Sequence, residues 1–314
     1  MAIQWFPGHM HATRKAIVER VKSGVDVVIE LLDARLPGSS ANPLLAQLTQ
    51  GKAAVKLLNK QDLADPERTA LWLAHYNALP DTRALPLDAS DTAPAQRLTE
   101  ACRALAPTRG GMAKPLRVLI CGIPNVGKST LINTLVGKKA AKTGDEPGIT
   151  KTEQRIVLAS DFTLFDTPGM LWPRIDVPES GYNLAASGAV GRNAIDEELV
   201  ALELIARLRA DYPGCIEARY QVTGLTAGDP DEAWLDAIGR RRGAVQSGGR
   251  ANVQKPAEAL IHAFRQATLG PITPETPEQL VAWRAGAAEE EVRRAAERDA
   301  RDRERRRRAA SRQR

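Results

Sequence analysis

The sequence predicts an α/β fold, in which a doubly wound sheet is followed by a small all-helical part and a basic tail. Six strand-like apolar runs are mostly separated by helical stretches, and polar motifs stand just beyond several of them. After residue 173 the composition changes, and helix-length amphipathic patterns replace the strand-like runs. The expected strands are 25–32, 53–58, 84–87, 116–121, 153–158 and 162–166.

The segment 122–129 (GIPNVGKS) matches the GxxxxGK[ST] pattern of phosphate-binding loops, and a helical stretch follows it. Its backbone N–H groups are expected to cradle phosphates at the start of that helix, where an anion is favoured. Lys128 would reach the β- and γ-phosphates, and the Ser129 hydroxyl would bind Mg²⁺. A chance glycine loop is disfavoured by the flanking strand and helix. The residues expected at the nucleotide here are Asn125, Val126, Gly127, Lys128, Ser129 and Thr130.

The motif DTPG begins at Asp166 and supplies the DxxG element that follows a strand in P-loop proteins. Asp166 is expected to hold Mg²⁺, and the N–H of Gly169 is expected to meet the γ-phosphate. The loop at 143–152 precedes this motif and is rich in Gly, Pro and Thr. Thr150 is the candidate that closes on Mg²⁺ and the γ-phosphate in the triphosphate state, with Thr152 as the alternative.

The tetrad NKQD at 59–62 matches the NKxD base reader of GTPases. The Asp62 carboxylate can accept from guanine N1–H and N2–H₂, which adenine does not offer, so the site should reject ATP. The stem of Lys60 would lie along the base plane. Asn59 would tie the base loop to the phosphate loop.

The motifs stand in a rotated order, because ordinary GTPases place the phosphate loop first and the base reader last. Asp88 and Ala89 follow the next strand-like run and are expected to offer N–H groups to guanine O6, although they match the usual Ser-Ala-Lys form loosely. A cyclic shift leaves each motif beyond its own strand, where ligands bind in open α/β sheets. The sequence therefore predicts a circularly permuted P-loop GTPase domain over 1–174 that binds GTP and GDP.

The rest of the chain divides by composition. Residues 180–284 are expected to form the all-helical domain, and 285–314 a solvated helix or a disordered arm. The last segment holds eleven Arg against seven Asp plus Glu, which is +4 of the net charge of +6. With a pI near 9.3, such charge favours salt-dependent contact with nucleic-acid phosphates, although a solvated surface would account for it equally well.

The chain shows no targeting signal that we recognise. No run approaches eighteen uninterrupted apolar residues, and the N-terminus lacks an apolar signal core, so we expect a cytoplasmic protein with no membrane partner. Cys102, Cys121 and Cys215 are odd in number and scattered. Their spacing is typical of reduced thiols and does not indicate a metal site.

At this point the chain resembles a known family. The opening IQWFPGHM at 3–10, the DARLP element at 33–37, the rotated motif order and DTPGMLWP at 166–173 together resemble ribosome biogenesis GTPase A, over residues 1 to about 280. The resemblance implies a GTPase of late assembly of the bacterial large ribosomal subunit, with a helical RNA-binding domain, Mg²⁺ and stimulation by potassium. It implies large-subunit precursors and rRNA as partners, and we expect a monomer off the ribosome.

Three candidate roles concern turnover. Met170 stands where many GTPases carry a glutamine that orients water, so we expect weak intrinsic hydrolysis, stimulated by the particle. His9, after a Pro-Gly pair, is the candidate for that positioning, with an RNA-facing role as the alternative. By resemblance to potassium-activated GTPases, Asn125 is a candidate K⁺ ligand, with a plain turn asparagine as the alternative.

The proline-bearing segment 170–180 runs from Gly169 into the helical part and would transmit a change at the γ-phosphate. The leading hypothesis is thus a switch that grips the ribosomal particle in the GTP state and is released after hydrolysis. Two alternatives remain: a GTPase serving a tRNA-modification or targeting machine, and a nucleotide-gated RNA-binding module with negligible turnover.

Overall fold

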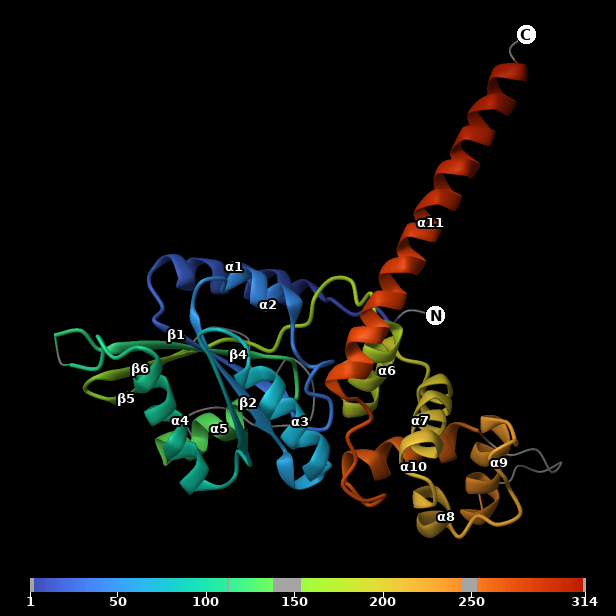
Figure 1. The fold of residues 1–314 in the computed structure, drawn as a ribbon, viewed down its shortest axis with the longest axis horizontal. Helices are drawn as coiled ribbons and strands as arrows, with labels where there is room; N and C mark the ends of the chain where they lie inside the picture. Colours follow the sequence, from blue (N-terminus) through green and yellow to red (C-terminus); the bar gives the residue numbers. More distant parts are fainter. Residues whose placement is uncertain (1–2, 112, 138–153, 244–252, 313–314) are drawn as a thin grey trace.

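The structure is a computed structural model and describes residues 3–111, 113–137, 154–243 and 253–312. Its centre is a six-stranded sheet with the order β3-β2-β1-β4-β6-β5 (Figure 1). All neighbouring strands are parallel except β5 and β6. The strands are β1 Val27–Asp33, β2 Ala53–Asn59, β3 Thr82–Leu87, β4 Leu116–Gly122, β5 Gln154–Ala159 and β6 Phe162–Asp166.

The central strands are apolar because both faces of the sheet are covered. Every residue of β1 is buried, and β4 is buried except for Arg117, which is the pattern expected of strands inside a parallel sheet. Each predicted strand lies within two residues of an observed one. The predicted α/β class is therefore confirmed.

Helices flank the sheet on both sides. Figure 1 shows α1 and α2 on one face and α4 and α5 on the other. Side-chain caps start two helices: Asn42 accepts from the first N–H groups of α2, and Asp65 does so for α3. These helices are α1 Gly8–Lys22, α2 Pro43–Leu48, α3 Pro66–Asn77, α4 Thr92–Leu105 and α5 Lys128–Val136, with a 3₁₀ turn at Gln61–Leu63.

A second group of helices follows the sheet and has an apolar core of its own. Leu204 and Ile205 of α7 and Leu260 and Phe264 of α10 are buried in it. The predicted division at 180–284 remains a prediction, although helices do occupy this part of the chain. They are α6 Pro178–Ser187, α7 Glu197–Asp211, α8 Cys215–Tyr220, α9 Asp231–Arg241 and α10 Gln254–Arg265, with a 3₁₀ turn at Arg192–Ala194.

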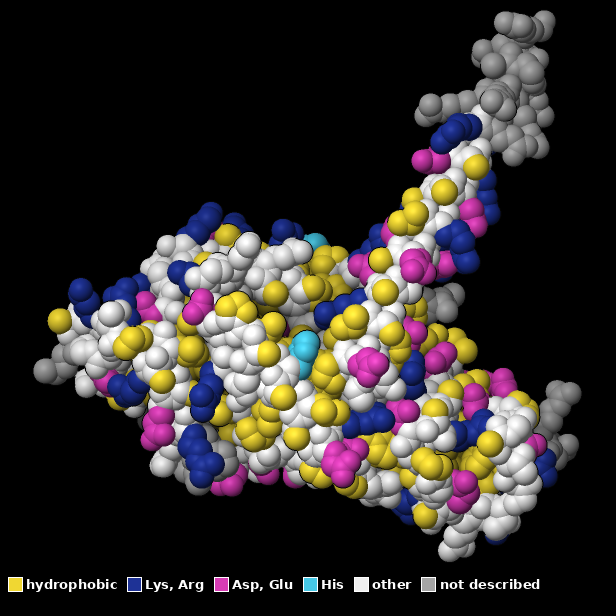
Figure 2. Space-filling model, in the orientation of Figure 1, with side chains coloured by type: hydrophobic (Ala, Val, Ile, Leu, Met, Phe, Trp, Pro, Cys, Tyr) yellow, Lys and Arg dark blue, Asp and Glu magenta, His cyan; other side chains and the backbone are white. Residues whose placement is uncertain are grey.

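The last helix, α11 (Pro277–Arg312), begins on the body and then projects away from it (Figure 1). Leu280 in its first turns packs with the buried Trp72 of α3. The predicted boundary at 285 therefore falls inside a continuous helix, which extends to Arg312. Basic, acidic and apolar side chains are interspersed along the part of this helix that Figure 2 colours by type. None of the helices in the described ranges is long and apolar enough to cross a membrane.

Candidate functional site

The phosphate loop connects the end of β4 to the start of α5. Gly127 has a φ of +100°, and a Cβ there would overlap the amide of Asn59, so glycine is required at this position. Lys128 is buried, and its Nζ donates to the carbonyls of Ile123 at 3.0 Å and Gly122 at 3.3 Å. The lysine therefore lies back over the loop in this structure.

The DTPG motif lies against the phosphate loop. The N–H of Met170 donates to the carbonyl of Gly122 at 3.1 Å. A Cβ on Gly169 would lie 2.8 Å from the Cα of Pro124, so only glycine lets the two segments approach this closely. The expected γ-phosphate contact of Gly169 thus sits beside the loop that would hold that phosphate.

Asp166 fits the role of a magnesium ligand. It is 1% exposed, and neither carboxylate oxygen has a hydrogen-bond partner among the described residues. Burial raises the pKa of Asp166 to about 6, against the lowering effect of the Lys128 charge, and burial lowers the pKa of Lys128. An unpartnered buried carboxylate is costly, and carboxylate and hydroxyl oxygens suit Mg²⁺. Ser129, in the first turn of α5, supplies the hydroxyl, so the donors fit the ion.

Asn59 joins the two halves of the predicted nucleotide site. Its Nδ2 donates to the carbonyl of Val126 at 2.7 Å, and its Oδ1 accepts from the N–H of Ala89 at 2.8 Å. Thr134 of α5 donates to the carbonyl of Ala89 at 2.7 Å. The base-side element that contains Asp88 is thereby held between β2 and α5.

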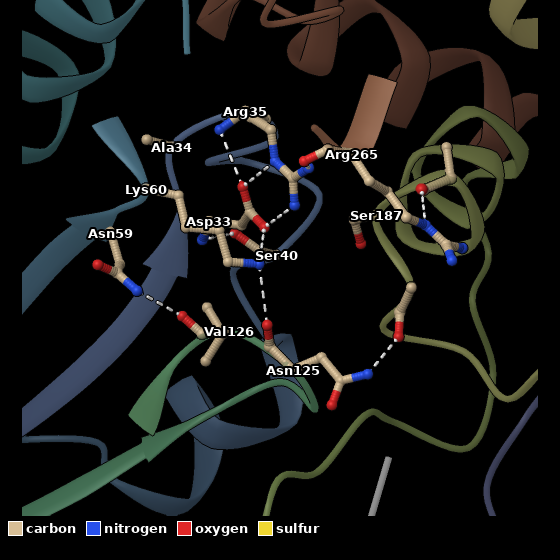
Figure 3. A network of polar contacts seen from close by, with 12 residues as sticks. Asp33, Ala34, Arg35, Ser40, Asn59, Lys60, Asn125, Val126, Ser187 and Arg265 are labelled. Atoms are coloured by element: carbon tan, nitrogen blue, oxygen red, sulfur yellow. Dashed lines mark hydrogen bonds and ion pairs between the residues drawn. The ribbon is translucent and has the colours of Figure 1, made fainter. Parts of the chain in front are cut away.

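Lys60 reaches two acceptors. It has a left-handed backbone with φ +64°, and its Nζ donates to the carbonyl of Asn125 at 2.9 Å and to the carboxylate of Asp33 at 3.0 Å (Figure 3). Asp33 ends β1 in register with Asn59. Burial acts to raise the pKa of Asp33, but the charges of Arg35 and Lys60 outweigh it and hold that pKa well below its usual range.

Asp62 lies exposed in the 3₁₀ turn that follows Lys60. An exposed carboxylate at this place is accessible to an incoming base. Thr150 and Thr152, the candidates for the switch threonine, lie outside the described residues, together with the loop that contains them.

His9 lies exposed in the first turn of α1, with its ring centroid 6.4 Å from that of Trp5. The adjacent Met10 is buried and its sulfur accepts from the N–H of Leu171 at 3.4 Å. The start of α1 therefore packs on the segment just after DTPG, while the imidazole of His9 faces outward.

Sequence reasoning missed several residues around this site. It gave no role to Asp33 and Arg35, which entered only through the family resemblance. Asp33 lies at the carboxyl end of β1, beside Asn59 at the carboxyl end of β2. That position could have indicated from the sequence that Asp33 lies near the ligand. No sequence signal pointed to the contact between Asn125 and Gly188, whose amide and carbonyl lie 2.8 Å apart across 63 residues of chain.

A protein family described as 50S ribosome-binding GTPase matches residues 117–207. This match begins inside β4, so it contains the phosphate loop and DTPG, whereas the base reader at 59–62 precedes it.

Curated relatives match most of the chain. A ribosome biogenesis GTPase A from Bacillus pumilus is 40% identical over 286 residues, covering 88% of this chain and 100% of the relative. A probable ribosome biogenesis GTPase A from Mycoplasma pneumoniae is 30% identical and covers 82% of this chain and 91% of its own length.

Two solved structures share the fold. GDP-bound YlqF aligns with a TM-score of 0.60 at 23% identity, covering 83% of this chain and 99% of that one. GNP-bound YlqF from T. maritima aligns with a TM-score of 0.57, also at 23% identity, over 84% and 98%. At this identity the likeness establishes the fold alone.

Proposed function

This chain belongs to the ribosome biogenesis GTPase A family and hydrolyses GTP, and we propose that it acts as a switch in late assembly of the large (50S) ribosomal subunit. It binds precursor particles and their rRNA in the GTP state and leaves after hydrolysis. The relatives named ribosome biogenesis GTPase A support the ribosomal partner. The observation of the structure that supports the nucleotide switch is the junction at Asn59, which ties the base reader to the phosphate loop. Segments that touch the γ-phosphate let go when it is lost. In this proposal the protein acts in the cytoplasm and is a monomer when it is off the particle.

Nucleotide binding in this proposal comes from both sides of the Asn59 junction. Lys128 and the N–H of Gly169 stabilise the charge that develops on the γ-phosphate. Ser129, Thr150 and Asp166 would hold Mg²⁺, which would supply positive charge against the phosphates. The nucleotide-contacting residues are Asn59, Lys60, Asp62, Asp88, Ala89, Asn125, Val126, Gly127, Lys128, Ser129, Thr130 and Gly169.

Potassium is proposed to bind beside the phosphates, at Asn125. Its Oδ1 would be the ligand atom, because its Nδ2 donates to the carbonyl of Gly188. A cation there adds positive charge as the bond to the γ-phosphate breaks. We expect faster GTP turnover in potassium than in sodium at equal ionic strength, and equal rates would remove this role.

The test of the proposed function is GTP turnover measured alone, with large-subunit precursors and with small subunits. We expect stimulation by the large-subunit particles only, together with co-sedimentation. Turnover and sedimentation that ignore these particles would favour a tRNA-modification or targeting machine. Turnover that stays negligible with bound particles would favour a nucleotide-gated RNA-binding module.

A further inference from the structure

A buried ion pair stands behind the base reader. Asp33 and Arg35 are each about 2% exposed. The guanidinium of Arg35 clasps the carboxylate with both arms, Nε to Oδ1 at 2.9 Å and Nη2 to Oδ2 at 2.7 Å, and its backbone N–H adds a third bond at 3.1 Å. Two parallel bonds of this kind fix the orientation of a carboxylate as well as its position.

That carboxylate in turn holds Lys60. The Oδ2 of Asp33 accepts from Lys60 Nζ as well as from Arg35, and the same Nζ also donates to the carbonyl of Asn125 in the phosphate loop (Figure 3). The end of the Lys60 side chain is therefore anchored between β1 and the phosphate loop. The methylene chain of Lys60 therefore runs from its own backbone in the NKQD tetrad to these two acceptors.

The same pair connects the site to the helical region. Arg35 Nη1 donates to the carbonyl of Arg265 at the end of α10, 3.2 Å away. The side chain of Arg265 donates to the carbonyls of Ala185 and Ala186 at the end of α6. Gly188, which caps that helix, accepts from Asn125 of the phosphate loop. Two contacts thus join the helical region to the proposed nucleotide site: Arg35 bonds to α10 on the base side, and Asn125 bonds to the end of α6 on the phosphate side (Figure 3).

We propose that Asp33 and Arg35 are positioning residues for guanine nucleotides, which hold Lys60 in place for the base and join that position to the helical region. This inference rests on the proposed base-reading role of Lys60. Without the Asp33 carboxylate, Arg35 and Lys60 would lose the acceptor that both of them bond, and their two cations would repel each other, so Lys60 would leave its position. Neither Asp33 nor Arg35 needs to touch the nucleotide.

A second ion pair, Glu30–Lys56, joins β1 to β2 without involving Lys60. Glu30 lies three residues before Asp33 on β1 and forms an ion pair with Lys56 of β2, and both side chains are largely buried. Glu30 also accepts from the N–H of Asn42 at the start of α2. The Glu30–Lys56 pair is therefore a matched control: it joins β1 to β2, whereas Lys60 directly follows β2, and among the described residues it has no hydrogen bond to the NKQD tetrad or the phosphate loop.

A double-mutant cycle on GDP affinity tests the proposal. We expect Asp33→Asn and Lys60→Met each to weaken GDP by about tenfold, and the double variant to be no weaker than Lys60→Met alone, because Asp33 acts through Lys60. Additive losses would mean that Asp33 supports the sheet in general, and would overturn the proposal. Arg35→Lys, which keeps the charge and loses the two-armed clasp, should give a smaller loss that also vanishes in the Lys60→Met background.

Two further measurements separate the possible failures. Glu30→Gln should lower the melting temperature and leave GDP affinity within about twofold of the unmodified protein. A loss of GDP affinity as large as that of Asp33→Asn would overturn the positioning role. An unchanged affinity in Lys60→Met would instead remove Lys60 from the proposed base reader, and the inference would fall with it.

Discussion

Asp62 is the residue on which the choice of base is proposed to depend. Its carboxylate would accept from two donors of guanine, and a site that hydrogen-bonds its ligand in this way rejects a ligand lacking those groups. Asp62→Asn should weaken GTP binding by about a hundredfold or more and admit xanthosine triphosphate, whose C2 carbonyl accepts from the new amide. Titration with the two nucleotides measures this exchange. Equal affinity of the unmodified protein for ATP and GTP would remove the base-reader role.

A variant of His9 can test how the attacking water is positioned. Met170, after DTPG, is buried and apolar, so it cannot orient water. If His9 does so, His9→Ala should lower particle-stimulated turnover by about a hundredfold and leave GDP affinity unchanged. His11, which is also exposed on α1 and packs its ring edge against Phe6, provides the control variant. Stimulated turnover that survives in His9→Ala would leave His9 with an RNA-facing role.

At the residue scale, the sequence revealed groups that belong to local motifs and missed those that act across the chain. The phosphate loop could be read because its glycines and Lys128 lie within eight consecutive positions. Arg35 and Arg265 are 230 residues apart, and neither has a local pattern that announces the other. Such partners follow only from how strands and helices pack, which a single sequence does not contain.

The helix α11 carries the arginine-rich segment, which lies beyond the motifs on which the sequence resemblance to the family was based. Its first turns pack on α3, whereas farther along exposed Arg–Glu pairs such as Arg294–Glu290 stabilise the helix. Composition alone left a choice between a solvated helix and a disordered arm, because neither form builds an apolar core. The strand runs were predicted more closely, since burial on both faces demands unbroken apolar sequence.

Deleting 285–314 should weaken particle binding and flatten its salt dependence. Each lost phosphate contact should reduce the slope of log K against log salt by about 0.7 to 0.9. GTP turnover without RNA should stay unchanged, because the deletion leaves Leu280 and its packing on Trp72 in place. Binding curves at several potassium chloride concentrations measure the slope. Replacing the four arginines at 305–308 by glutamine isolates the contribution of charge, and an unaltered slope in both variants would exclude the tail from RNA binding.

The segment 170–180 was the expected route from the γ-phosphate to the helical region. The structure adds a direct route, because Asn125 of the phosphate loop bonds to Gly188 at the end of α6. The Pro178 that was expected to stiffen the segment is the first residue of α6. In the proposed switch, a change at the phosphates would therefore have two routes into the helical region, the segment 170–180 and this hydrogen bond.

At the scale of the whole molecule, Glu275 fastens the helical region to the sheet. It is fully buried, and its Oε1 accepts from the N–H groups of Gly38 and Ser39 at 2.6 and 2.9 Å. Its Oε2 accepts from the hydroxyl of Ser39 and from Asn183 of α6. Four donors converge on one carboxylate, from segments that are far apart in the sequence.

Glu275→Gln should lower the free energy of unfolding by about 2 kcal/mol, since either orientation of the amide sets its NH₂ against donors and leaves them unsatisfied. Urea unfolding of the variant measures the loss. Glu290→Gln, a change at a half-exposed side chain of α11, should lower the free energy of unfolding far less, because ion pairs at the surface contribute little to stability. A Glu275→Gln variant as stable as this control would show that the carboxylate does not hold the two regions together.

In the proposed function, GTP sets the sheet and the helical region in one arrangement that binds the particle. The most direct test of this proposal is the affinity of the unmodified protein for purified large-subunit precursors, measured with a non-hydrolysable GTP analogue and with GDP. The coupling between the two sites predicts binding that is about tenfold or more tighter with the analogue. Equal affinity in the two nucleotide states, or tighter binding with GDP, would contradict it.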